Sequence, residues 1–431
     1  MIPVVVISLI TFILVIVSIL FFPHLKIKKI TLDTYWMIAL LGALILIIFG
    51  LVPIRDIGSE LTSSKAINPL KILVLFFSMT IISIFLDEFG LFKYLAAKSA
   101  QNIKGSQMRL FLMLYALTSV LTIFTSNDIV ILTLTPFICF FCKHAKINPL
   151  PYLIGEFVAA NTWSLMFIIG NPTNIYLATS AGINFVDYFK AMWLPTVLAG
   201  ITEIVIMLGL FYKKLQEPIT VGTADEHIES RVDVIIGLTH LIVCLVFLII
   251  SSYINVEMWL VSLISGTSLV LCTLVVRLVT KEHWNYLGES FKRLPYQLIP
   301  FFLSMFVIVV AYNYQGITGE ISKFLGNSQT VWVYGYSSFL TCNLINNIPM
   351  SMLFSDVALS LTGTSYSQAI FASIIGSNIG AFLTPIGALA GIMFTSLVNK
   401  YGMRFRFIDF VMYGAIIAIP TITVALAGLL I

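Results

Sequence analysis

Charged residues are scarce in this chain of 431 residues: Asp, Glu, Lys and Arg make up 10% of it, whereas hydrophobic residues make up 59%. Ordinary globular domains carry about 25% charged residues. The shortage therefore excludes a water-soluble globular protein. The net charge is only +4, and the basic residues are spread over the whole chain instead of forming one stripe. A nucleic-acid partner is therefore not expected.

Cysteine and histidine are also few, with five of each. The cysteines are Cys139, Cys142, Cys244, Cys272 and Cys342. All five lie in apolar segments, and an odd number there argues against a disulfide framework. Histidines and carboxylates do not recur at the spacing of a metal site, and the His-Glu-x-x-His motif is absent. We therefore expect no cofactor and no metal, and a protein that is not an enzyme.

Long apolar runs fill most of the chain, and many approach or exceed the roughly 20 residues that a membrane-spanning helix needs. They lie near 3–22, 35–53, 70–86, 109–126, 129–142, 151–169, 190–212, 233–253, 257–276, 298–314, 330–345, 349–361, 368–398 and 408–431. The first run lacks a preceding basic residue and a following cleavage site, so we expect a first span and not a signal peptide. The sequence predicts an all-α polytopic membrane protein in contact with the lipid bilayer.

Lys and Arg predict the orientation, because basic loops are retained in the cytoplasm. We place the loop around Lys26 inside, and we treat 109–142 and 330–361 as re-entrant hairpins that open to opposite faces. All but five of the 24 basic residues then lie inside; the exceptions are Arg55, Lys65, Lys71, Lys190 and Lys323. This arrangement predicts a multi-pass protein of the inner (plasma) membrane with both termini outside.

Two halves of the chain carry matching motifs. Phe-Phe-Ser-Met at 76–79, followed by Gly90, returns as Phe-Leu-Ser-Met at 302–305, followed by Gly316. In the predicted orientation the first copy runs inward and the second runs outward. The repeats are therefore predicted to be inverted.

A hydrophilic stretch separates the two halves. Residues 213–232 mix charges of both signs, which is typical of a solvated connector. We predict an N-terminal half at 1–212, with one extra first helix, a cytoplasmic linker at 213–232 and a C-terminal half at 233–431.

Each half contains one segment that cannot continue as a regular helix. Gly-Asn-Pro-Thr-Asn occupies 170–174 and Thr-Pro-Ile-Gly occupies 384–387. Proline lacks an amide hydrogen, and the residue before it is steered away from helical geometry. A broken helix survives in the hydrocarbon region only where protein or a water-filled cavity satisfies its backbone. Paired breaks of this kind indicate a secondary transporter whose substrate binds near the bilayer midplane.

Polar tips are predicted for the two hairpins. Asn-Asp-Ile at 127–129 returns as Asn-Asn-Ile at 346–348. We expect Ser126, Asn127 or Asp128 to cap the returning arm, whose positive N-terminal end would point at the substrate. A carboxylate at membrane depth is usually functional, so Asp128 is predicted to accept a proton or bind a cation, with a structural cap as the alternative.

These motifs define one candidate site for a substrate or ion, built from side-chain oxygens, amides and unwound backbone. Its predicted binding residues are Ser126, Asn127, Asp128, Asn161, Gly170, Asn171, Thr173, Asn174, Asn346, Asn347, Ser377, Asn378, Thr384 and Gly387. Asp128 is the predicted coupling residue, and Glu156 is the second candidate. Glu156 either faces the site or pairs with a loop amine. Asp87 and Glu88 are expected at the membrane interface, and Glu203 has no predicted role.

Several blocks resemble the arsenite efflux pumps of the ion transporter superfamily. They are 126–128 through Thr135 and Pro136, Pro-Tyr-Gln at 295–297, Asn-Asn-Ile-Pro at 346–349, and 376–380 through 384–387. The resemblance covers nearly the whole chain. It implies two inverted repeats, each with a re-entrant hairpin and a broken helix. It also implies efflux of arsenite or antimonite driven by proton influx, in some cases with a cytoplasmic ATPase partner.

Alternatives remain open on the sequence alone. Asn161 and Asn378 stand where the arsenite pumps commonly carry Asp, and the block at 170–174 is closer to the sodium-coupled and antiporter branches. The substrate is thus a small inorganic oxyanion, a neutral hydroxide or a cation. A sodium/proton antiporter and a sodium-coupled anion transporter of the dicarboxylate type are the alternative functions, and a homodimer is an open alternative to a monomer.

Overall fold

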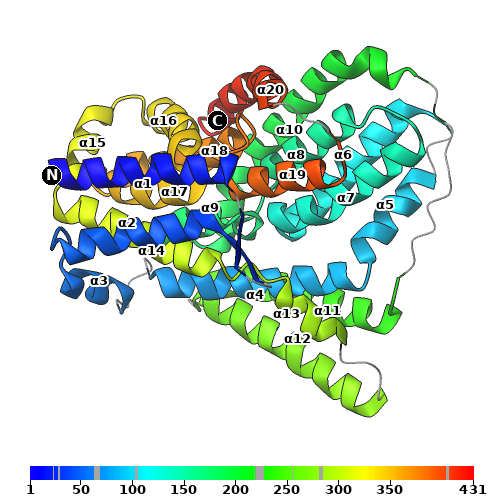
Figure 1. Ribbon diagram of the computed structural model, residues 1–431, viewed down its shortest axis with the longest axis horizontal. Helices are drawn as coiled ribbons and strands as arrows, with labels where there is room; N and C mark the ends of the chain where they lie inside the picture. Colours follow the sequence, from blue (N-terminus) through cyan, green and yellow to red (C-terminus); the bar gives the residue numbers. More distant parts are fainter. Residues whose placement is uncertain are drawn as a thin grey trace.

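The computed structural model describes residues 1–22, 24–27, 30–62, 68–101, 105–217, 219, 228–254, 256–280, 285–403 and 407–431. These residues form an almost entirely helical molecule (Figure 1). Among them, eight helices are long and apolar enough to cross a membrane, or nine if one bent pair counts as a single span. The predicted multi-pass helical membrane fold is therefore confirmed.

The N-terminal half contains ten helices, one short 3-10 turn and two strands within the described residues. Their bounds are α1 Ile2–Phe21, β1 His24–Ile27, β2 Ile30–Asp33, α2 Thr34–Ile48, α3 Ile54–Leu61, α4 Pro69–Glu88, α5 Leu91–Gln101, α6 Gln107–Phe124, α7 Asn127–His144, α8 Leu150–Trp163, η1 Ile168–Gly170, α9 Pro172–Ser180 and α10 Phe185–Leu215.

The C-terminal half contains the remaining ten helices of the described chain. Their bounds are α11 Arg231–Ile254, α12 Met258–Thr280, α13 Asn285–Lys292, α14 Leu298–Tyr314, α15 Ile317–Leu325, α16 Thr330–Ile345, α17 Asn347–Ala358, α18 Gly363–Gly380, α19 Leu389–Lys400 and α20 Phe407–Gly428. Residues 218 and 220–227 of the predicted linker at 213–232 lie outside the described residues, and the division into two halves stays a prediction.

A small antiparallel hairpin departs from the expectation of helices alone. Strand β1 pairs with β2, and Leu25 lies opposite Leu32. Apolar and polar residues alternate through Leu25, Lys26 and Ile27, and such alternation favours a strand over a helix. The loop that was predicted to follow α1 therefore contains a β-hairpin.

The first pair of repeated motifs occupies equivalent positions in two helices. Helix α4 ends just before Gly90, and α14 ends just before Gly316. Both glycines have a positive φ, of 77° and 72°, a conformation that glycine adopts without steric cost. The chain turns by 79° between α14 and α15 at the second of them. The inverted relation between the halves stays a prediction.

Both predicted helix breaks are present. The first lies between α8 and α9, and the second between α18 and α19. The apolar run at 368–398 is consequently two helices and not one. The first break is longer than the sequence indicated, because α8 already ends at Trp163 and the chain forms only η1 before Pro172 starts α9.

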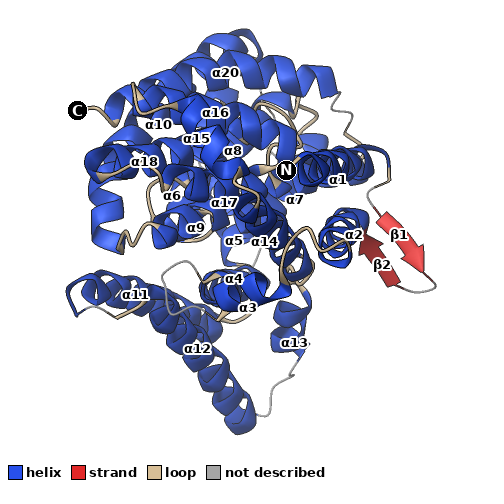
Figure 2. Ribbon diagram, turned by 90° about the vertical axis from the view of Figure 1, so that its left-hand side faces the viewer, coloured by secondary structure: helices blue, strands red, loops and turns tan. Residues whose placement is uncertain are grey.

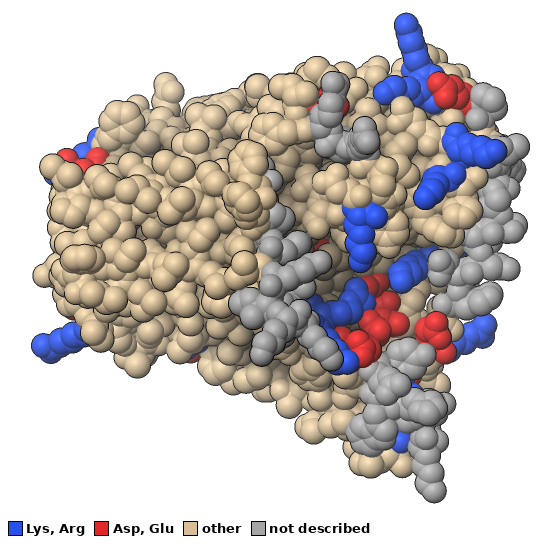
Figure 3. Space-filling model, viewed as in Figure 1, with Lys and Arg blue, Asp and Glu red and all other residues tan. Residues whose placement is uncertain are grey.

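Charged side chains gather toward one end of the visible face (Figure 3). That end carries α5 and α13 in the matching ribbon view, whereas a broad belt over α1, α2 and α16 is almost free of charge (Figures 1 and 3). An uncharged belt of this kind is expected for surface that faces lipid. The predicted placement of the cationic end in the cytoplasm remains a prediction.

Helices α11 and α12 form a separate arm of the molecule. They pack on each other and on α4, away from α16, α18 and α20 (Figure 2). Two ion pairs hold this arm. Arg277 Nη2 lies 2.6 Å from the Asp233 carboxylate within the arm, and Lys71 Nζ lies 2.6 Å from the Glu257 carboxylate between α4 and the α11–α12 turn.

Helices α16 and α18 approach each other very closely because glycines face each other. A Cβ atom on Gly376 would lie 2.3 Å from the Gly335 carbonyl oxygen and 2.0 Å from Ser338 Oγ. Small residues at such interfaces let membrane helices pack backbone to backbone. This contact sets the position of α18, which carries Ser377 and Asn378.

We expect Gly376→Val to destabilise the protein, because the added methyl groups would collide with the α16 backbone. Overpacking costs about 1–3 kcal/mol in typical cores. Gly209→Val is the matched control, since Gly209 is also helical but has open space where a Cβ would be. The measurement is the thermal unfolding midpoint in detergent. Equal midpoints for the two variants would contradict the close α16–α18 contact.

Candidate functional site

The end of α8 meets the tip of the first hairpin through two amides. Asn127 Nδ2 donates to Asn161 Oδ1 at 3.2 Å, and Asn161 Nδ2 donates to the Phe157 carbonyl at 2.8 Å. A backbone carbonyl can only accept, so this chain fixes the orientation of both amides. Asn127 Oδ1 is then left buried without a hydrogen-bond partner among the described residues.

Asn378 joins the two halves of the chain at the centre of the site. Its Oδ1 accepts from Ser164 Oγ at 2.8 Å and from Asn171 Nδ2 at 2.9 Å. Its Nδ2 donates to Asn174 Oδ1 at 2.6 Å and to the Ile374 carbonyl at 2.9 Å. One side chain from α18 thus contacts three residues of the first break and its flanks. The structure brings together Asn171, Asn174 and Asn378.

The first break is held by side chains that replace the lost helical hydrogen bonds. Asn171 caps α9, and its Oδ1 accepts from the Thr173 amide at 3.1 Å and from Thr173 Oγ1 at 3.0 Å. Asn174 Nδ2 donates to the freed Ser164 carbonyl at 2.8 Å. Gly170 is required here, since a Cβ would lie 2.3 Å from that same carbonyl oxygen.

The second break is closed by Asn343. Its Nδ2 donates to the Gly380 carbonyl at 2.9 Å, and its Oδ1 accepts from Thr384 Oγ1 at 2.6 Å. We did not predict Asn343 as a site residue. Its position one helical turn before Asn346 on the same arm was the available signal.

The tip of the second hairpin is tied directly to the second break. Asn346 Nδ2 donates to the Ile386 carbonyl at 3.1 Å, and the Asn347 backbone amide donates to the Gly387 carbonyl at 3.0 Å. Asn346 also caps α17, accepting from the Ile348 amide at 3.4 Å. Asn346, Asn347, Thr384 and Gly387 therefore form a second half-site.

The first tip differs, because its cap is not made. Ser126 occupies the N-cap position of α7, yet its side chain makes no capping hydrogen bond, so the predicted cap is wrong there. Ser126 Oγ, Asn127 Oδ1 and Ser377 Oγ are all buried without a partner in the described part of the chain. A buried polar atom without a partner costs about 1–3 kcal/mol. These oxygens are thus available to a bound solute or ion.

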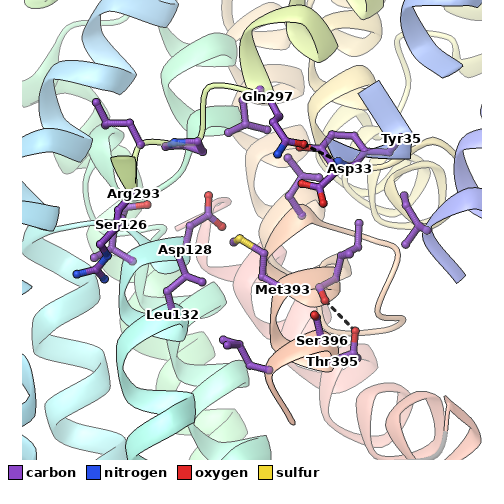
Figure 4. A pocket seen from close by; sticks show the side chains of 18 of the residues that line it. Asp33, Tyr35, Ser126, Asp128, Leu132, Arg293, Gln297, Met393, Thr395 and Ser396 are labelled. Atoms are coloured by element: carbon purple, nitrogen blue, oxygen red, sulfur yellow. Dashed lines mark hydrogen bonds between the residues drawn. The ribbon is translucent and has the colours of Figure 1, made fainter. Parts of the chain in front are cut away.

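A cavity of about 780 Å³ opens beside the first tip. Asp128 projects into its middle, with Ser126 on the same element and Met393 across from it (Figure 4). The far wall carries Tyr35 and Gln297, and the Asp33 amide donates to Gln297 Oε1 at 3.1 Å.

This lining includes residues that the sequence analysis missed, among them Asp33, Tyr35, Arg293, Gln297, Thr395 and Ser396. The Pro-Tyr-Gln block at 295–297 was the one signal for this wall. The other residues come from distant segments, and nothing local marks them as neighbours of Asp128.

Basic residues at the rim of the cavity are already paired. Arg293 Nη1 lies 2.8 Å from the Glu88 carboxylate and Arg293 also pairs with Asp87, while Lys292 pairs with Glu289 at 2.7 Å. Burial alone would lower the pKa of Arg293, but the Asp87 and Glu88 carboxylates raise it above its ordinary value. The rim therefore carries charges of both signs, and both of these basic residues are paired with carboxylates.

Glu156 lies deeper in the protein and is fully enclosed. Thr135 Oγ1 is 2.9 Å and 3.0 Å from its two carboxyl oxygens. Its partner is thus a hydroxyl of α7 and not a loop amine, which was one of the two expected environments. Thr135 and Asp128 lie on the same helix. Helix α7 therefore carries one predicted coupling residue, Asp128, and contacts the other, Glu156, through Thr135.

A second, smaller cavity of about 220 Å³ lies near the start of α4. Lys71, Asn184 and Glu257 are among the residues that line it. The hydrogen bond from Lys71 lowers the pKa of Glu257. The larger cavity contacts the same helix further along, at Phe76 and Thr80.

No group of three His, Cys, Asp or Glu side chains in the described ranges is arranged to hold a metal ion. The side chains gathered at the two breaks are amides and hydroxyls. Amides, hydroxyls and unwound backbone between paired helices are the features expected at the candidate site of a multi-pass membrane transporter.

The chain belongs to the family described as citrate transporter (CitMHS), whose sequence profile matches residues 26–376. It is 26% identical to an arsenical pump membrane protein of Escherichia coli over 406 residues, which cover 91% of this chain and 92% of that protein. It is also 24% identical to a putative arsenical pump membrane protein of Bacillus subtilis, in an alignment that covers 84% of this chain and 86% of that protein.

A solved structure has the same fold. The YdaH transporter of Alcanivorax borkumensis superposes with a TM-score of 0.57 and covers 99% of this chain and 96% of that one, at 15% sequence identity. The resemblance to the ion transporter superfamily, and to its arsenical pumps, is therefore confirmed.

We expect Ser164→Ala and Asn378→Ala to be non-additive, because the two side chains share one hydrogen bond across the two halves. Coupling between contacting residues is about 0.5–3 kcal/mol. The measurement is the free energy of unfolding of both single variants and the double variant.

Ser373→Ala combined with Ser164→Ala is the matched control. Ser373 lies on the same helix as Asn378, but its hydroxyl bonds only to its own helix, at the Ala369 carbonyl. Its effect should add to that of Ser164→Ala within about 0.5 kcal/mol. Additivity of the Ser164 and Asn378 pair would show that Asn378 does not join the halves.

Proposed function

We propose that this transporter exports arsenite or antimonite, as the neutral trihydroxide, in exchange for protons. The observation that carries the proposal is the position of Asp128. It is a carboxylate in the first turn of α7, at the tip of the first hairpin, and it lines the 780 Å³ cavity. A carboxylate at membrane depth that faces a cavity is suited to bind and release protons.

The electrostatics of the first tip favour a neutral solute over an anion. The N-terminus of a helix carries a partial positive charge that attracts anions. Asp128 already supplies a negative charge in the first turn of α7 and would repel an anionic substrate. A trihydroxide can instead donate to Asn127 Oδ1 and exchange hydrogen bonds with the hydroxyl of Ser126, two groups without partners within the described chain.

A carboxylate substrate is the second candidate, because the family carries the description citrate transporter. Lys292 and Arg293 line the cavity and could attract such an anion. Both are paired with carboxylates, as described above, so an incoming anion would have to displace those partners. The same unpartnered oxygens would also suit Na⁺, which keeps sodium coupling as an outcome of the test below.

Alternating access agrees with the arrangement of the cavities. The larger cavity reaches Asp128 and the smaller one lies near Lys71, and the proposal assigns the two cavities to opposite faces of the membrane. The proposal also includes export toward the exterior and an orientation with both termini outside. It further includes a cytoplasmic ATPase partner and a homodimer.

Transport into everted membrane vesicles tests the proposed substrate and coupling ion. We expect a proton gradient with the acidic side inside the vesicles to drive accumulation of arsenite and antimonite. We expect a protonophore to abolish this accumulation. A sodium gradient should not replace the proton gradient, and citrate should not accumulate. Expression should also rescue growth on arsenite of a strain without its own arsenite pump, but not of a strain without sodium extrusion. Accumulation of citrate or dependence on sodium would overturn the proposal.

Asp128→Asn should abolish uphill transport while the protein still reaches the membrane in normal amounts. Asparagine keeps the size of the side chain and makes the first tip resemble the second, where Asn347 stands in the equivalent place. The measurement is gradient-driven accumulation in vesicles, beside the amount of protein in the membrane.

Asp187→Asn is the matched control. Asp187 also lies in the first turn of a helix, α10, but its side chain is exposed. Its replacement should leave transport unchanged. If Asp128→Asn still drives uphill transport with unchanged pH dependence, the carboxylate is structural, and coupling is to be sought at Glu156.

A further inference from the structure

Three helices meet at a carboxyl group for which the sequence predicted no role. Glu203 lies in the middle of α10 and is completely buried. One of its oxygens accepts from Tyr115 Oη of α6 at 2.6 Å, and the other accepts from Thr162 Oγ1 of α8 at 2.5 Å. Trp163 Nε1 donates in turn to Tyr115 Oη at 3.0 Å.

Helices α6, α8, α11 and α20 pack against α10. Among the titratable groups on the described parts of these five helices, Tyr115 is the one that contacts Glu203. Within the described chain, Lys, Arg, His or a second carboxylate does not reach it. Buried carboxylates are normally paired with a cation. Glu203 is held by hydroxyl groups instead.

The hydrogen bonds around Glu203 can be completed in both of its protonation states. When it is ionised, Tyr115 and Thr162 each donate one proton to it. When it is protonated, its own proton can go to Tyr115 Oη, and the Tyr115 proton can turn to the Gly200 carbonyl at 2.9 Å. Trp163 can donate to Tyr115 Oη in either state, so neither state leaves a polar hydrogen without an acceptor.

The ionised state holds the end of α8 more tightly. Hydrogen bonds to an ionised acceptor are shorter and roughly twice as strong as neutral ones. Thr162 and Trp163 belong to the last turn of α8, directly between Asn161 and Ser164 of the candidate site. A change of charge at Glu203 therefore acts on the segment that positions those two residues.

We propose that Glu203 is a second proton-binding site, separate from Asp128, and that its proton controls how firmly the last turn of α8 is held. Glu203 is a positioning residue in this scheme, because it contacts Thr162 and Tyr115 and not the cavity. This inference goes beyond the proposed function and depends on neither the substrate nor the coupling ion.

The fluorescence of Trp163 tests the proposal without substrate or gradient, because its indole hydrogen bond reports on Tyr115. The Trp163 emission is obtained as the difference between the natural protein and Trp163→Phe, both purified in detergent and titrated over the pH range in which they stay monodisperse. We expect the Trp163 emission to titrate with pH. We expect Glu203→Gln to lose this titration, because glutamine keeps the shape and cannot change charge.

Two further variants make the test specific. Tyr115→Phe removes the hydroxyl that links the indole to the carboxyl, so it should also lose the titration even if Glu203→Gln does not fold. Glu156→Gln is the matched control, because Glu156 is an equally buried carboxyl that contacts α7 and not Tyr115. It should keep the titration. A Trp163 emission that does not depend on pH, or one that still titrates in Glu203→Gln or Tyr115→Phe, would overturn the proposal.

Discussion

The structure depends on one constraint: a helix that breaks inside a membrane must find partners for the backbone groups it frees. Water cannot supply them in the hydrocarbon region, where each unsatisfied group costs several kcal/mol. Here asparagine side chains supply them. Asn174 satisfies the Ser164 carbonyl at 2.8 Å, and Asn343 satisfies the Gly380 carbonyl at 2.9 Å. The amides that stabilise the breaks are also the groups proposed to bind a solute, so stability and the candidate site share the same side chains.

The two half-sites use this solution differently. The second tip is closed. Asn346 caps α17 and donates to the second break, and the Asn347 backbone amide also donates to the second break. The first tip is left open: Ser126 makes no cap, Asn127 keeps an oxygen free of partners in the described chain, and Asp128 faces a cavity. The two tips, similar in sequence, thus differ in structure: the second is closed by hydrogen bonds, and the first keeps polar atoms without partners among the described residues.

Three carboxyl groups of the N-terminal half have different surroundings. Asp128 faces a cavity. The carboxyl group of Glu156 is hydrogen-bonded to one hydroxyl, that of Thr135, and the carboxyl group of Glu203 is hydrogen-bonded to hydroxyls from two other helices. Helix α8 carries Glu156, Thr162 and Trp163 and ends at the first break, so two of these environments act on the helix that leads into the site. The positioning proposed for Glu203 would therefore act next to Asn161, which also accepts a hydrogen bond from Asn127, the residue before Asp128.

The sequence by itself determined the membrane fold, the two breaks and most of the amides around them, because apolar run length, proline and glycine act locally along the chain. It missed the β-hairpin before α2 and the early end of α8. Only the tertiary structure decided that Asn378 reaches across to Asn171 and Asn174, that Asn343 closes the second break, and that Gln297 and Tyr35 face Asp128. These contacts join segments far apart in the chain, and they depend on helix packing such as the close approach at Gly376, which no local pattern encodes.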